Sequence, residues 1–205
     1  MIGFISVDFQ MEFTDPSGSQ YRVRSSVRFV KTTLIPWFKE KGIKAAEIIS
    51  DYRQPRVGDR GDCCYPGSRG YHSEIPQEVK VAPAWVKCMN DPTWVRKGIG
   101  DERVTRNQLG LPYQDPEGFN AWLEKVVMVG NQKLNFIVLF GLTLDCCVFC
   151  VAQQLNFRGY RVLILEEGTD TFSGDQPEKK RIISYPPLTN WARPIAWNIL
   201  RAKFH

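Results

Sequence analysis

The stretch GLTLDCCV, from Gly141 to Val148, places two adjacent thiols where a buried strand is expected to become a helix. The preceding residues 135–140, NFIVLF, have the unbroken apolar character of a strand covered on both faces. The following residues 148–159, VFCVAQQLNFRG, have helical character and end at a glycine. A cysteine in the first turn of a helix lies near the positive end of the helix dipole and near unpaired N–H groups, which favour the thiolate. A small buried core residue would also suit this position.

Other apolar runs alternate with helical patterns along the rest of the chain. Strands are expected at 2–7, at 44–50 and at 160–167, and helices from Ser25 or Ser26 to Gly42, with a kink or limit at Pro36, and from Pro116 to about Val129. This order predicts an α/β protein with three layers, α/β/α, and a mostly parallel, Rossmann-like sheet. The length of 205 residues fits one domain spanning 1–205.

Two parts of the chain give weaker signals. Residues 52–94 are rich in glycine and proline and are expected to lack regular structure, after which TWVRK predicts a short strand ending at Lys97. The C-terminal segment is expected to be helical after Pro194. In parallel sheets ligands bind at the carboxyl ends of strands. The groups that follow predicted strands, and so should collect at one edge, are Asp8, Asp51, Lys97 and Cys147.

The composition narrows the function classes. Hydrophobic residues make up 43% of the chain, but no run approaches the ~18 apolar residues that span a bilayer. The first residues, MIGFISVDFQ, do not resemble a signal peptide, so we expect a soluble cytoplasmic protein with no membrane partner and six reduced cysteines. The net charge of +5 comes from scattered basic residues, which favours a solvated surface over nucleic-acid binding.

Four motifs in the same order resemble those of the isochorismatase-like cysteine hydrolases, a family that includes the nicotinamidases. They are VDFQMEF at Val7, CYPGSRGYHSEIP at Cys64, VRKG at Val95 and GLTLDCCV at Gly141, followed by a strand segment RGYRVLILEEGTDTF at Arg158. Together they cover roughly residues 2 to 172. The resemblance implies a cysteine hydrolase that acts on a C–N bond of a small amide, ureido or carbamoyl compound. It also implies a homo-oligomer, a dimer or a tetramer. We expect no cofactor.

The family's catalytic triad carries over to three positions. Cys147, which directly precedes Val148, matches the nucleophile, Asp8 matches the general base and acid, and Lys97 matches the supporting cation. Cys146 falls at a variable position. The resemblance also implies a cis peptide bond between Leu142 and Thr143, and an oxyanion hole formed by the backbone N–H groups of Thr143 and Cys147.

The chain departs from the nicotinamidases at their metal site. Those enzymes hold a metal with an Asp-x-His pair and further histidines, whereas SDYRQP retains Asp51 but has Arg53 in place of the histidine. We therefore expect no metal. A guanidinium suits a carboxylate or carbonyl oxygen, so Arg53 is a candidate substrate ligand, with an exposed loop arginine as the alternative.

Several aromatic and polar residues are further candidates for the substrate pocket. Phe13 matches a pocket position of relatives, and Trp94, Tyr52 and Gln54 are also candidates, although core packing explains an aromatic residue equally well. A different class of function remains open as well: a non-catalytic binding or scaffold protein that keeps the fold. Selective alkylation of Cys147 near neutral pH distinguishes the enzyme from the scaffold.

Overall fold

Six parallel strands form one sheet at the centre of the computed structural model, which describes residues 2–53, 62–129 and 132–204. Neighbours along the sheet follow the order β10-β9-β8-β1-β2-β3, and every pairing is parallel. The strands are β1 (Ile2–Val7), β2 (Ala45–Ser50), β3 (Lys80–Lys87), β8 (Phe136–Leu142), β9 (Arg161–Asp170) and β10 (Ala192–Ile195). The predicted parallel sheet is confirmed.

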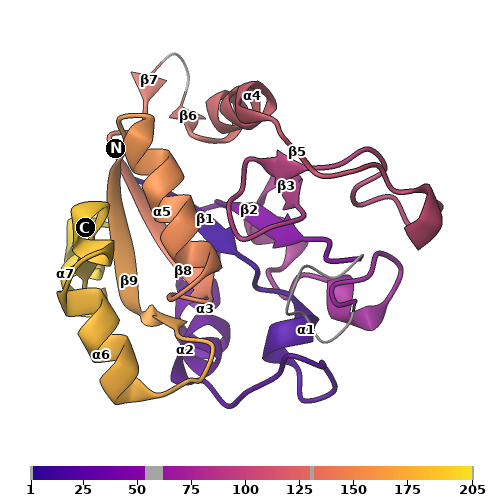
Figure 1. Ribbon diagram of the computed structural model, residues 1–205. Helices are drawn as coiled ribbons and strands as arrows, with labels where there is room; N and C mark the ends of the chain where they lie inside the picture. Colours follow the sequence, from indigo (N-terminus) through magenta and orange to yellow (C-terminus); the bar gives the residue numbers. More distant parts are fainter. Residues whose placement is uncertain (1, 54–61, 130–131, 205) are drawn as a thin grey trace.

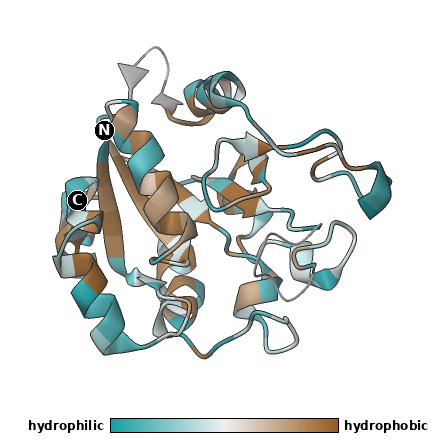
Figure 2. Cartoon of the chain, viewed as in Figure 1, coloured by the Kyte–Doolittle hydropathy of each residue, from teal (hydrophilic) through white to brown (hydrophobic). Residues whose placement is uncertain are grey.

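Helices cover both faces of this sheet (Figure 1). One face packs against α4 (Pro116–Val126), α5 (Cys147–Phe157) and α6 (Gln176–Ser184). The other packs against α2 (Ser25–Phe29), a π-helical turn at Val30–Leu34, α3 (Ile35–Lys41) and α7 (Trp197–Arg201). Figure 2 shows the apolar strands β8 and β9 between more hydrophilic outer surfaces such as that of α6. The three predicted layers are therefore confirmed.

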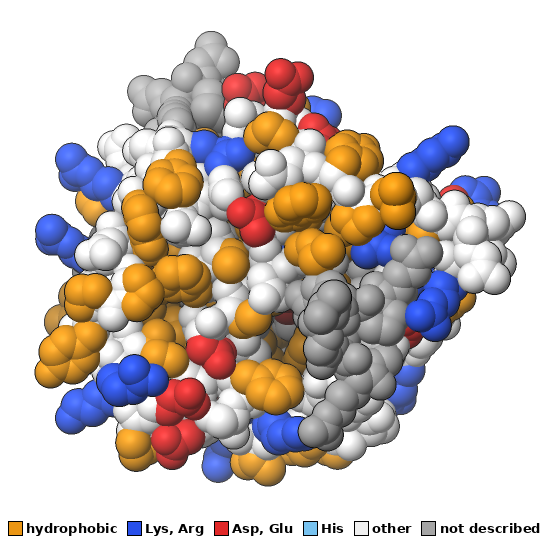
Figure 3. All heavy atoms as spheres, in the orientation of Figure 1, with side chains coloured by type: hydrophobic (Ala, Val, Ile, Leu, Met, Phe, Trp, Pro, Cys, Tyr) orange, Lys and Arg blue, Asp and Glu red, His pale blue; other side chains and the backbone are white. Residues whose placement is uncertain are grey.

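The remaining elements are short. They are α1 (Met11–Thr14), the antiparallel pairs β4 (Trp94–Val95) with β5 (Tyr113–Gln114) and β6 (Met128–Val129) with β7 (Gln132–Lys133), and several 3₁₀ turns. None of the described helices has the length and apolar character needed to cross a bilayer. On the face that Figure 3 shows, Lys and Arg side chains are dispersed and do not gather over one element.

Local sequence signals explain the helix boundaries. The Asp115 carboxylate accepts a hydrogen bond from Gly118 N–H and caps α4. Gly42 ends α3 with a left-handed φ of 64°. The interruption expected at Pro36 takes the form of the π-helical turn directly before it, where the wider turn accommodates a residue that has no N–H to donate.

Strand β3 corrects the prediction that residues 52–94 lack regular structure. Pro83 lies in its middle, after a cis bond from Ala82, and the register with β2 shifts between Ala46 and Ile48. Such a proline is tolerated because β3 is the edge strand and pairs with β2 alone in the described sheet. Strand β3 ends at Lys87, whereas the predicted strand TWVRK contributes only β4, which lies outside the central sheet.

The strand order reverses between β1 and β8. From β1 the chain builds outward through β2 to β3, then crosses over and builds through β8 and β9 to β10 on the other side. Such a switch point opens a crevice at the carboxyl ends of the two central strands. Those ends are Val7, which is followed by Asp8, and Leu142, which leads into the loop before Cys147.

Gly141 allows the backbones of β1 and β8 to approach each other closely at this point. Its φ is 112°, and a Cβ added there would lie 2.1 Å from the Val7 carbonyl oxygen. Gly141→Ala is therefore expected to lower the free energy of unfolding by about 3 kcal/mol or more, measured by denaturant titration. Gly159→Ala is the matched control, because its φ of 80° is also positive but no atom lies within 4 Å of the added Cβ. That control should lose only about 1 kcal/mol, and equal losses would contradict the backbone clash.

Candidate active site

Asp8 lies directly after β1 and is 1% exposed. Its φ of 47° is unusual for a residue other than glycine, and its N–H donates to the Ile48 carbonyl at 2.8 Å. The Ser50 hydroxyl donates to Asp8 Oδ1 at 2.8 Å, and Lys87 Nζ donates to Oδ2 at 2.9 Å. The carboxylate is thus fixed at the carboxyl edge of the sheet with both oxygens engaged.

The lysine of this site is Lys87, the last residue of β3. Its side chain is fully buried, and Nζ lies 2.9 Å from Asp8 Oδ2, 2.7 Å from Ser50 Oγ and 3.3 Å from Cys147 Sγ. Burial alone would lower the pKa of Lys87. The negative charge of Asp8, followed by the Cys147 and Tyr52 groups, outweighs burial and raises that pKa well above its usual value. Lys87 therefore stays a charged ammonium although its side chain is buried.

The expectation that Lys97 supplies this cation is wrong. Lys97 is exposed on the loop after β4, and its backbone carbonyl accepts a hydrogen bond from Gly110 N–H at 3.1 Å. Because β4 lies outside the central sheet, the residue that follows it does not reach the carboxyl edge. Identifying β3 as a strand would have placed Lys87 there by the same rule that located Asp8.

Cys147 begins α5, as predicted, and its thiol is buried. Sγ lies 3.3 Å from Lys87 Nζ, 3.3 Å from the Tyr52 hydroxyl and 3.6 Å from Asn90 Oδ1. A contact with the Cys146 side chain, burial and the Asp8 charge together raise the pKa of Cys147 well above its usual value, against the opposite effect of Lys87. The raised pKa favours the thiol over the thiolate at this position, so the sulfur would have to pass on its proton before it could act as a nucleophile.

The charges of Asp8, Lys87 and Cys147 can balance one another within the cluster. With Asp8 ionised, Lys87 charged and Cys147 a thiol, the three groups sum to zero charge. Moving the proton from sulfur to the Asp8 carboxylate leaves that sum unchanged. Because a net charge is costly in a buried site, this conserved neutrality makes the thiolate accessible without the ionisation of an isolated thiol.

The loop before α5 presents backbone N–H groups to the same region. The bond between Leu142 and Thr143 is cis, which confirms that prediction. The amides of Leu144, Cys146 and Val148 donate within the loop and to Asp170. By contrast, those of Thr143 and Cys147 donate to no other residue in the described part of the chain. These two amides, one directly after β8 and one at the start of α5, therefore remain able to donate to a ligand.

Arg53 is neither a free substrate ligand nor an exposed loop arginine. Its side chain is fully buried, and its guanidinium forms a two-pronged ion pair with Asp51, Nε to Oδ1 at 2.9 Å and Nη2 to Oδ2 at 2.5 Å. The remaining N–H groups donate to the backbone carbonyls of Gly98, Asp101 and Val104. The Arg53 guanidinium thus binds groups of the protein itself. This corrects both expectations from the sequence, the substrate ligand and the exposed loop arginine.

The other predicted pocket residues have different surroundings. Phe13, on α1, packs in the core on the side of α2 and α3, and Trp94 is half-buried on β4. Contact of either residue with a substrate stays a prediction. Tyr52 lies inside the site, whereas Gln54 falls outside the described residues. Ser50 and Asn90 were not anticipated, although Ser50 ends a predicted strand and its position could have indicated it.

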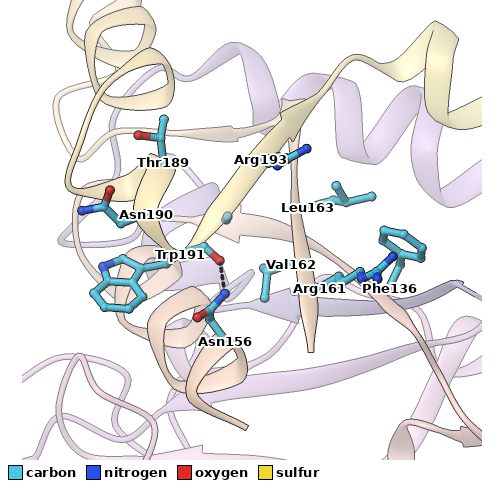
Figure 4. Close-up of a pocket in the computed structure, with 10 residues that line it drawn as sticks. Phe136, Asn156, Arg161, Val162, Leu163, Thr189, Asn190, Trp191 and Arg193 are labelled. Carbon is cyan, nitrogen blue, oxygen red and sulfur yellow. Dashed lines mark hydrogen bonds between the residues drawn. The ribbon is translucent and has the colours of Figure 1, made fainter. Parts of the chain in front are cut away.

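A separate hollow lies at the opposite edge of the sheet (Figure 4). It measures about 610 Å³ and is lined by residues at the amino ends of β8, β9 and β10, among them Phe136, Arg161 and Arg193. In Figure 4 Arg161 and Phe136 lie on one side of the hollow, and Asn156 and Trp191 on the other. These groups do not converge on one point and are remote from the carboxyl edge that carries Asp8.

Comparison with solved structures gives matches over nearly the whole chain. An isochorismatase-like hydrolase from Alkaliphilus metalliredigens is 12% identical with a TM-score of 0.64, covering 100% of this chain and 99% of that one. The chain adopts the isochorismatase-like hydrolase fold. Pyrazinamidase of Pyrococcus horikoshii in complex with zinc is 14% identical, with a TM-score of 0.61 and coverages of 96% and 99%. N-carbamoylsarcosine amidase from Thermoplasma acidophilum is 18% identical, with a TM-score of 0.57 and coverages of 95% and 95%. No protein-family model matches the sequence, and no curated protein matches it significantly.

The pyrazinamidase structure contains zinc, which raises the question whether the residues around Asp51 in this chain could bind a metal ion. Both Asp51 oxygens accept from Arg53, and Gly100 N–H donates to Oδ2 at 2.9 Å. Glu74 pairs with Lys31 at 2.7 Å. Within the described ranges, no three His, Cys, Asp or Glu side chains form a group that could hold a metal ion. A guanidinium occupies the carboxylate that a metal would need, so the residues do not fit one.

Proposed function

We propose that this protein hydrolyses a C–N bond of a small amide, ureido or carbamoyl compound through a thioester on Cys147. The observation that carries the proposal is the buried cluster in which Lys87 Nζ contacts both Asp8 Oδ2 and Cys147 Sγ. Burying a lysine and a carboxylate is costly, and a cysteine that only packs in the core would not require them beside it. The fold, which is shared with amide-cleaving enzymes, supports the same reaction class.

The first half of the reaction forms the thioester. Asp8 takes the thiol proton, and Cys147 Sγ attacks the substrate carbonyl carbon. The oxygen of the tetrahedral intermediate accepts hydrogen bonds from the Thr143 and Cys147 amides, while Lys87 balances the negative charge. Asp8, now a carboxylic acid, returns its proton to the departing nitrogen as the C–N bond breaks.

The second half releases the acid. Asp8 takes a proton from water, and the resulting hydroxide attacks the thioester carbon. Collapse of this second intermediate breaks the C–S bond, and the sulfur regains its proton from Asp8. Each group ends in its starting state, and no step needs a metal. The expected homo-oligomer and cytoplasmic location stay predictions.

Cys147→Ala is expected to lower ammonia release from any accepted substrate to below about a thousandth of the wild-type rate. The assay is a screen of small amides, ureido acids and carbamoyl compounds with purified protein. Cys150→Ala is the matched control, since Cys150 is a second thiol on the same helix, one turn further along α5. A metal chelator should leave the wild-type rate unchanged.

The scaffold alternative gives different results. A protein that turns over none of these compounds, and whose Cys147 resists iodoacetamide near neutral pH, would be a binding protein with this fold. Retained turnover in Cys147→Ala would instead remove the thioester mechanism.

A further inference from the structure

The Tyr52 hydroxyl contacts two members of the cluster and has no role in the reaction described above. It is 2.7 Å from Lys87 Nζ and 3.3 Å from Cys147 Sγ, and the side chain is 4% exposed. The Lys87 ammonium also lies 4.9 Å from the centre of the Tyr52 ring. The phenol is thus enclosed against the nucleophilic sulfur.

The donors and acceptors around Lys87 determine which group donates each of these hydrogen bonds. The ammonium has three N–H donors, but four atoms accept within reach: Asp8 Oδ2, Ser50 Oγ, Tyr52 OH and Cys147 Sγ. The ammonium has no lone pair, so the Ser50 and Tyr52 hydroxyls are acceptors towards it and keep their own protons to donate. Ser50 gives its proton to Asp8 Oδ1 at 2.8 Å.

The acceptors for the Tyr52 proton include two groups among the described residues. They are Cys147 Sγ at 3.3 Å and the Met89 carbonyl at 3.4 Å. A hydrogen bond to an ionised acceptor is roughly twice as strong as one to a neutral acceptor. The sulfur therefore becomes the preferred partner once it loses its proton.

The residues on either side hold Tyr52 in this position. Asp51 and Arg53 form the buried ion pair, and Arg53 N–H also donates to Asp51 Oδ1 at 3.3 Å. The Tyr52 N–H donates to the Cys63 carbonyl at 3.2 Å. Because the backbone is tied at each of these residues, the phenol is oriented before the thiolate forms.

We propose that Tyr52 is a further catalytic residue, whose hydroxyl donates a hydrogen bond to the Cys147 sulfur whenever that sulfur carries negative charge. This role, which rests on the proposed function, applies twice in each cycle: before attack on the carbonyl and again when the C–S bond of the thioester breaks. The phenolic proton stays on oxygen throughout, while the thiol proton goes to Asp8.

The test is the pH dependence of Cys147 alkylation by iodoacetamide, followed by mass spectrometry of the modified peptide. The titratable groups that face the sulfur are Asp8, Lys87, Tyr52 and Cys146. Tyr52→Phe keeps the ring over Lys87 and removes only the hydroxyl. Loss of a donor to the thiolate should move the alkylation midpoint to higher pH by about one unit and slow the reaction about tenfold at neutral pH.

Two comparisons make the result specific. Tyr160→Phe is the matched control, because this buried tyrosine precedes β9 at the opposite edge of the sheet, and it should leave the midpoint unchanged. Incorporating 3-fluorotyrosine in place of Tyr52 retains the fold and gives a more acidic, stronger donor, so the midpoint should move to lower pH. Ultraviolet absorbance of the thiolate should follow both shifts.

An unchanged midpoint in folded Tyr52→Phe, or a fluorotyrosine shift of the opposite sign, overturns the inference even if turnover falls. Alkylation requires no substrate, so this outcome is separate from the fate of the proposed function. A protein without hydrolytic activity whose midpoint still shifts retains the Tyr52 hydrogen bond and loses only the hydrolase proposal.

Discussion

Lys87→Met is expected to lower hydrolysis by a factor on the order of 10³ or more, while Lys97→Met leaves the rate unchanged. Lys87 Nζ contacts both Asp8 and Cys147, so its loss would remove the charge that, in the proposed reaction, stabilises both the thiolate and the oxyanion. Lys97 has the same side chain ten positions later but is exposed. The pair of variants therefore compares the two lysines directly, with steady-state ammonia release as the measurement.

The same substitution should also destabilise the fold. Methionine leaves the Asp8 carboxylate, 1% exposed, without its countercharge, which costs about 3–5 kcal/mol for a buried pair. The pKa of Lys87 is raised, so the stability that this ammonium contributes is fully present below the ordinary lysine pKa and is lost only as pH rises through the raised value. The difference from wild type in denaturant titrations should therefore be constant from neutral to mildly alkaline pH.

Two results would contradict this assignment. The first is a Lys87→Met protein that retains wild-type turnover. The second is a Lys97→Met protein that loses its turnover while keeping its stability.

Arg53→Met is expected to lower the free energy of unfolding by about 3–5 kcal/mol, because it leaves Asp51 buried without a partner. The matched control is Arg103→Met. Arg103 also pairs with an aspartate two residues away, Asp101 at 2.8 Å, but its side chain is 86% exposed. A pair in water contributes about 0–1 kcal/mol, so the control should be nearly neutral in the same thermal or denaturant unfolding experiment.

A third variant isolates the pairing itself. In the double variant Asp51→Asn with Arg53→Met, the unpaired buried charge is gone, so the loss should be smaller than the sum of the two single losses. Additive losses, or equal losses for Arg53→Met and Arg103→Met, would show that the buried ion pair does not stabilise the segment around Tyr52.

The sequence predicted the elements whose patterns are uninterrupted. Strands β1, β2, β8 and β9 are apolar runs followed by turn residues, and Cys147 sits at a helix start that its neighbours define. These features depend on residues close in the chain. For that reason Asp8 and Cys147 were placed correctly at the sheet's carboxyl edge.

The errors come from features that depend on tertiary context. Pro83 obscured β3 in the sequence, since only its edge position allows a proline there, so Lys87 was not considered. The resemblance of the VRKG segment led to Lys97 instead. The partner of Arg53 is two residues away, but the carbonyls that complete its cage come from Gly98, Asp101 and Val104. Helix α6 was also missed, because its polar segment shows its buried side only when packed on the sheet.

The switch point between β1 and β8 has a consequence for the chain before it is complete. Asp8 and Lys87 come from strands on one side of that junction, and Cys147 comes from the loop on the other. During synthesis the sulfur emerges last of the three and meets its acid and amine only when β8 docks beside β1. Until then the thiol lacks both partners, so the cluster of the three side chains can form only once β8 has joined the sheet.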